Sequence, residues 1–143
     1  MSFEELMKTV AEAVKENPGL YGTPVIVLDP GDVANGIETL FAKASRCVVV
    51  MFGGSAPVKQ GLSGPLIDKV RIVVRVFDKP SLTRVDRPGV TLLGMAREIA
   101  KGLQHLRREG MTSALYYRGI GEITQYKGGI VSCDVNFDTD ECL

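Results

Sequence analysis

The segment spanning residues 67–77 constrains the fold most, because its side chains alternate in character along the chain. Apolar residues recur at every second position, namely Val70, Ile72, Val74 and Val76. Basic residues occupy positions between them, namely Lys69, Arg71 and Arg75. A side-chain period of two is that of a β-strand with one buried face. We therefore predict a strand that contributes one face to a core and presents the other to water or to a partner.

Bulk composition limits the possible partners. A chain of 143 residues has the usual length of one domain and can bury a sizeable core without disulfides or metals. Its 17 basic and 17 acidic side chains cancel, so no overall positive field attracts nucleic acid or an anionic membrane. No apolar run approaches the ~20 residues that span a bilayer. We expect an intracellular protein with no membrane and no specific nucleic-acid partner.

The amino-terminal half contains alternating helix and strand patterns. Ser2 and Glu5 form a capping-box pattern before a helix that ends at the Asn17-Pro18-Gly19 sequence. A short strand at 23–28 and a helix at 33–44 follow. Residues 46–52 are apolar on both faces, which predicts a strand in the interior of a sheet.

Two loops are expected around the basic-striped strand. Residues 53–65 include four glycines and two prolines, which predicts a long loop where a partner could bind. Residues 78–89 form a second excursion. An amphipathic helix then starts at Leu92, extends past Leu106 and ends at Gly110. Two closing strands are expected at 113–117 and 130–137.

This order of elements predicts an α+β fold, with residues 1–143 forming a single domain around a mixed, largely antiparallel sheet with helices on one face. We place the basic-striped strand beside the last strand, so that Arg71 and Arg75 lie opposite Asp134, Asn136 or Asp138. Each such exposed pair contributes about 0.2–1 kcal/mol. A binding role for the basic face remains an equal alternative.

Residue types suited to catalysis are scarce. The single histidine, His105, falls on the solvent side of the predicted helix, and the 53–59 segment lacks the phosphate-loop pattern. Cys47 and Cys133 lie within apolar strands, whereas Cys142 near the end is expected to be an exposed thiol. The acidic residues from 138 to 141 are expected to be solvated. We predict no catalytic residue, no metal site and no cofactor, and therefore no enzyme.

In four segments the chain resembles the tail terminator, or tail-completion, proteins of long-tailed bacteriophages and prophages. These are the strand at 70–77, the Pro-containing turn at 78–84, the helix at 92–106 and the closing strand at 128–139. Proteins of this family are similar in length and begin with a helix and an early strand. The resemblance covers most of the chain in layout.

The resemblance implies a structural function. Subunits would assemble into a ring, commonly a hexamer, that caps the head-proximal end of the tail tube, ends tube polymerisation and supports head–tail joining. The partners would be further copies of the chain, the tail-tube protein and the head–tail connector, in the host cytoplasm during assembly and then in the virion tail. Five basic residues would contact neighbouring subunits or the tail tube, or would line the ring: Lys69, Arg71, Arg75, Arg84 and Arg87.

Two other functions are compatible with the sequence. A head–tail connector or another small virion assembly protein would share the ring but contact a different neighbour. A small-molecule-binding α+β domain would need a pocket with convergent polar groups, and no such group stands at diagnostic spacing.

Overall fold

The structure of the protein is a computed structural model that describes residues 1–27, 45–58, 64, 66–81 and 91–142. The helix expected at 33–44 lies outside the described residues, as do Arg84 and Arg87 and part of the 53–65 segment.

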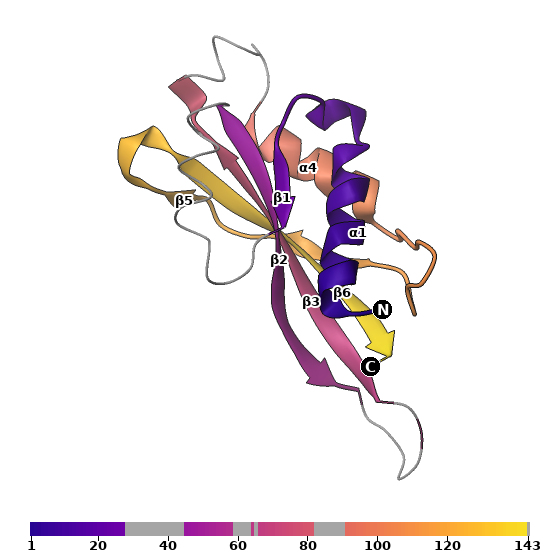
Figure 1. The fold of residues 1–143 in the computed structure, drawn as a ribbon. Helices are drawn as coiled ribbons and strands as arrows, with labels where there is room; N and C mark the ends of the chain where they lie inside the picture. The colour runs from indigo at the N-terminus through magenta and orange to yellow at the C-terminus, as the bar shows by residue number, and fades with distance from the viewer. Residues whose placement is uncertain (28–44, 59–63, 65, 82–90, 143) are drawn as a thin grey trace.

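The described elements combine helices with one mixed sheet. In chain order they are α1 (Phe3–Lys15), η1 (Pro18–Leu20), β1 (Val25–Val27), β2 (Arg46–Pro57), β3 (Ile67–Asp78), α4 (Leu92–Leu103), β4 (Tyr116–Ile120), β5 (Thr124–Gln125), η2 (Lys127–Gly129) and β6 (Val131–Cys142). The strand order is β1-β2-β3-β6-β4, and β5 also pairs with β6. Only the β1–β2 pair is parallel among the described pairs. Helices α1 and α4 cover the same face (Figure 1), which confirms the predicted α+β fold.

Helix starts follow the local sequence. The Ser2 hydroxyl accepts the Glu5 N–H at 3.1 Å, and the Glu5 carboxylate accepts the Ser2 N–H at 3.1 Å, which is the predicted capping box. Helix α4 ends at Leu103, well before the predicted end at Gly110. His105 adopts a φ of 62°, and its N–H donates to the Leu115 carbonyl at 2.9 Å. Pairing with the segment before β4 therefore ends the helix.

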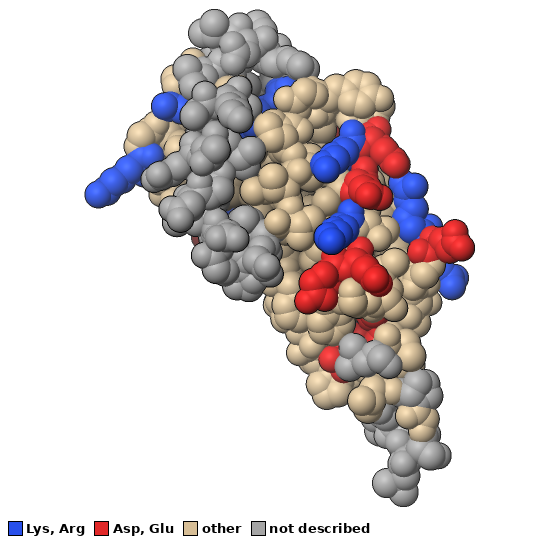
Figure 2. Space-filling view, in the orientation of Figure 1, with Lys and Arg blue, Asp and Glu red and all other residues tan. Residues whose placement is uncertain are grey.

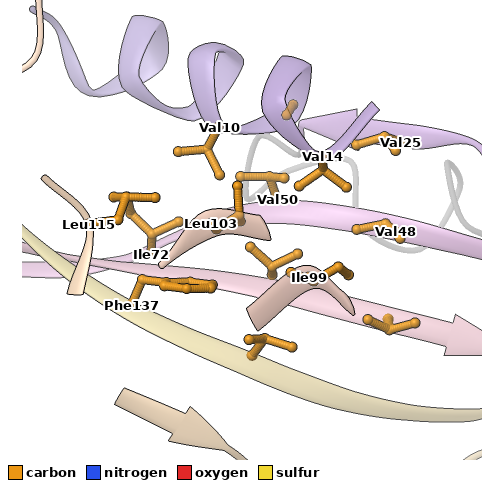
Figure 3. Close-up of a cluster of buried hydrophobic side chains, with 14 of the residues drawn as sticks. Val10, Val14, Val25, Val48, Val50, Ile72, Ile99, Leu103, Leu115 and Phe137 are labelled. Atoms are coloured by element: carbon orange, nitrogen blue, oxygen red, sulfur yellow. The ribbon is translucent and has the colours of Figure 1, made fainter. Parts of the chain in front are cut away.

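The core lies between the helices and one face of the sheet. Strands β2, β3 and β6 contribute Val50, Ile72 and Phe137, all fully buried. Helices α1 and α4 close the layer with four side chains that Figure 3 labels, namely Val10, Val14, Ile99 and Leu103. Burying each large aliphatic or aromatic side chain stabilises the fold by about 1.5–3 kcal/mol.

Strand β2 is longer than predicted. Residues 53–57 were expected in a loop, yet they continue β2 to Pro57, with a register shift between Phe52 and Ser55. The shift is a β-bulge, and its irregular backbone explains why glycines occupy positions 53 and 54. A Cβ at Gly53 would stand 2.9 Å from the Arg71 Cγ, and Gly54 has a φ of 104°. The β2–β3 hairpin extends past the amino end of α1 (Figure 1).

The closing strands are also displaced from their predicted positions. Strand β4 occupies Tyr116–Ile120 rather than 113–117, and β6 continues to Cys142 rather than ending at Phe137. Strand β2 lies between β1 and β3, so the prediction that the apolar 46–52 segment is interior is confirmed.

Leu103→Ala should lower the free energy of unfolding by about 2–5 kcal/mol, because this side chain is 1% exposed and its removal leaves a cavity. Leu93→Ala on the same helix is the matched control, since Leu93 is 49% exposed and should change stability by about 0.5 kcal/mol or less. Urea denaturation measures both. Equal losses would contradict the orientation of α4.

Candidate interaction surface

The outward face of the sheet, opposite the helices, is organised by the pairing of β3 with β6. The two strands are antiparallel over their whole lengths, from Ile67 opposite Cys142 to Asp78 opposite Val131. This register sets Arg75 opposite Asp134 and Arg71 opposite Asp138. The predictions that these strands are neighbours and that these charges face one another are confirmed.

Arg75 forms an ion pair within the chain. Its Nε lies 2.7 Å from Asp134 Oδ1 and its Nη2 lies 3.1 Å from Asp134 Oδ2, a two-point contact. The hydrogen bond to Asp134 raises the pKa of the Arg75 guanidinium. A guanidinium and a carboxylate that share two hydrogen bonds are held in a fixed orientation relative to each other. Arg75 therefore links β3 to β6, and its guanidinium is not available to contact a partner.

Arg71 is held loosely. Its Nε lies 3.9 Å from Asp138 Oδ1, whereas Arg118 Nε lies 2.7 Å from Asp138 Oδ2. The side chain of Arg71 is 65% exposed and that of Asp138 is 11% exposed. Arg118 is thus the main partner of Asp138, and the Arg71 guanidinium stays accessible. Lys69 is exposed as well and makes no ion pair with any described residue.

These accessible cations adjoin a shallow recess at the bulge of β2. The recess has a volume of about 220 Å³. Its lining comprises Lys69, Arg71, Asp138 and residues 53–56. The structure thus brings together two of the five predicted contact residues, assigns Arg75 to an internal pair, and does not describe Arg84 and Arg87.

The acidic end of the chain is structural, which corrects the expectation that it is solvated. Glu141 is fully buried, and Asp138 is 8% exposed. The Glu141 carboxylate accepts the Thr112 Oγ1–H at 3.2 Å and lies 3.3 Å from the Met1 amino group. Thr112 is distant from Glu141 in sequence, so no local pattern indicates this contact.

Hydroxyl groups cap the outer edge of β6 beyond β4. Ser113 Oγ accepts the Asp140 N–H at 3.0 Å, and Thr112 Oγ1 accepts the Cys142 N–H at 3.1 Å. Residues 112 and 113 thus satisfy backbone groups that would otherwise form an open edge. Cys142 itself is half-buried within β6, rather than an exposed thiol in a tail.

The remaining candidate groups show no catalytic arrangement. Burial raises the pKa of Cys47 to about 12 and that of Cys133 to about 11, so both thiols stay protonated at neutral pH. Their predicted burial is confirmed. His105 is exposed, as predicted, but lies beyond the helix with its ring 6.3 Å from that of Tyr116. Within the described ranges, no cluster of three His, Cys, Asp or Glu could hold a metal ion.

On the helical side of the molecule, the charged side chains of the described residues are of mixed sign. In Figure 2, acidic and basic side chains are interspersed where α1 lies. Arg108 Nη2, for example, lies 2.6 Å from Glu16 Oε2. None of the described helices is long and apolar enough to cross a membrane.

Comparison with known proteins gives a likeness in fold. No protein family matches the sequence, and no curated protein is significantly similar to it. The structure is similar to a chain in the solved virion of a native gene transfer agent particle, with a TM-score of 0.60 and 13% sequence identity. The match covers 96% of this chain and 95% of that one. The two chains share a fold.

Arg75→Gln should lower the free energy of unfolding by up to about 1 kcal/mol, because it breaks the two-point contact with Asp134. Arg71→Gln removes the same charge from the same strand and should cost less than about 0.5 kcal/mol, because Arg71 is largely solvated. Urea denaturation of the two variants makes the comparison. A larger loss of unfolding free energy for Arg71→Gln would contradict the conclusion that Arg75 is the residue that links β3 to β6.

Proposed function

We propose that the protein is a tail terminator-like structural protein of a phage or prophage. Copies of the chain form a ring, a hexamer in this proposal, that caps the tail tube, ends its polymerisation and supports head–tail joining. The observation that carries the proposal is the likeness in fold, over nearly the full length of both chains, to a chain of a gene transfer agent virion, a phage-like particle. The layout of the sequence supports the same family.

Ring formation needs two different surfaces that complement each other on one subunit. The sheet has two unlike edges, since the order β1-β2-β3-β6-β4 places β1 and the end of β2 on one side and β4 on the other. The β2–β3 hairpin also projects past α1 (Figure 1). Such a subunit has distinct surfaces for a neighbour in the ring and for the tube.

Lys69 and Arg71 are the candidate contact residues that this proposal retains from the described part of the chain. Both are exposed beside the bulge of β2, whereas Arg75 is engaged with Asp134. The neighbours are other copies, the tail-tube protein and the head–tail connector. The protein assembles in the host cytoplasm and remains in the virion tail.

Native mass spectrometry of the purified protein, alone and with the tail-tube protein from the same genome, tests the function. The expected result is a closed oligomer of about six subunits, formed either alone or on the tube. Lys69→Glu with Arg71→Glu should reduce assembly while leaving the thermal transition nearly unchanged, because neither side chain is buried.

Arg97→Glu is the control for that double variant, because it reverses one exposed charge on α4, and it should assemble normally. A strict monomer under both conditions would contradict the ring. An oligomer that binds a head–tail connector and ignores the tube protein would favour the connector function instead.

A further inference from the structure

The end of the sheet beyond α1 has two edges, and the described residues cap only one of them. On the β6 side, Ser113 and Thr112 cap the backbone with their hydroxyls. On the β2 side, pairing with β1 stops at Val27 opposite Val50, and no described residue pairs with the outer edge of residues 52–57. Open edges are templates for an added strand, and proteins usually block them. Among the described residues, the β6 edge is capped, whereas the β2 edge has no partner at Ser55, and the bulge between Phe52 and Ser55 together with Pro57 limits pairing there to a short stretch.

Backbone groups on the β2 side are positioned for pairing. The Val58 N–H donates to the Ile67 carbonyl at 2.9 Å, so the alternation of an antiparallel ladder directs Ala56 toward β3 and Ser55 outward. The Ser55 N–H and carbonyl therefore face the open edge. Residues 52–58 include no charged side chain, and residues 55–57 are exposed.

The cationic recess adjoins this same edge. Residues 53–56 of β2, Lys69 and Arg71 of β3, and Asp138 of β6 line it. Arg71 is only loosely tied to Asp138, whose carboxylate has Arg118 at 2.7 Å as its closer partner. A carboxylate entering the recess would gain a guanidinium and an ammonium without displacing a tight ion pair.

We propose that the outer edge of β2 binds an extended acidic segment of a neighbouring virion protein, which adds a strand beside Ser55 and places one carboxylate against Lys69 and Arg71. Main-chain pairing provides affinity in this mode of recognition, and the recess provides the preference for acid. The inference rests on the proposed function in that it specifies the chemistry of a neighbour on the same surface.

Charge distinguishes this occupant from two others. Nucleic acid would require several available cations, whereas the recess has two and also contains the Asp138 carboxylate. Strand β4, the opposite edge strand of a second copy, contains the cation Arg118 and no acidic residue. A single acidic side chain on a protein strand fits both the charge and the edge.

Selection of short random peptides displayed on a carrier, with the purified protein as bait, tests the proposal. Enriched peptides should combine β-branched residues with an Asp or Glu at a fixed position. Replacing that acid by its amide in a synthetic peptide should weaken binding at least about tenfold, measured by fluorescence anisotropy.

Three variants locate the site. Lys69→Gln with Arg71→Gln should abolish the preference for acid, and Ser55→Pro should weaken all selected peptides by removing the outward N–H. Arg97→Gln, on the far side of the molecule, should change nothing. If Ser55→Pro fails to fold, amide chemical-shift changes in the wild type must centre on residues 53–57 and 67–71.

Several results would overturn the proposal: no enrichment, enrichment without an acid, a preference that survives the double variant, or tighter binding of a DNA oligonucleotide than of the peptide. Failure of the terminator function is separate, because peptide binding needs no ring. Acid-selective peptides bound by a protein that never assembles would support the edge site and reject the ring.

Discussion

The uninterrupted pairing of β3 with β6 is the interaction on which the rest of the structure depends. It sets Ile72 beside Phe137 on the core face and Arg75 beside Asp134 on the outward face. A slip of one residue would exchange these faces and bury charge while exposing the core. The Arg75–Asp134 contact therefore favours the same register that the hydrophobic core requires.

The same pairing shapes the outward surface. Because β6 continues past β4 to Cys142, the sheet extends beyond the helices as a ribbon of β2, β3 and β6. Thr112 and Ser113 cap one edge of that ribbon, and the glycine bulge of β2 lies at the other. The surface features that the proposed assembly would use thus follow from how far β6 extends.

Patterns with a clear period predicted much of this fold. The alternation at 67–77 predicted β3, its partner strand and the facing charges, and the capping box predicted the start of α1. Composition misled at residues 53–57, because glycines that accommodate a bulge in a strand resemble those of a loop. Glu141 was missed because its contact with Thr112 depends on tertiary structure alone.

A likeness of 13% identity establishes a fold, and the proposal of a virion function goes one step beyond it. What links the fold to assembly is the surface itself. Arg75 forms an internal contact with Asp134, whereas Lys69 and Arg71 lie beside an edge that no described residue pairs with. The first charge therefore stabilises the fold, and the other two are accessible to a partner. The sequence alone could not separate them, because the three residues occupy equivalent positions on one strand.

Hydrogen–deuterium exchange of the protein, alone and mixed with a candidate tail-tube protein, is the sharpest test of the proposed contact surface. We predict that assembly slows exchange at residues 52–58 and 67–71 and leaves α1 nearly unchanged. Slowed exchange confined to α1 and α4, with the end of β2 exchanging as in the isolated protein, would contradict the claim that this edge of the sheet is the contact surface.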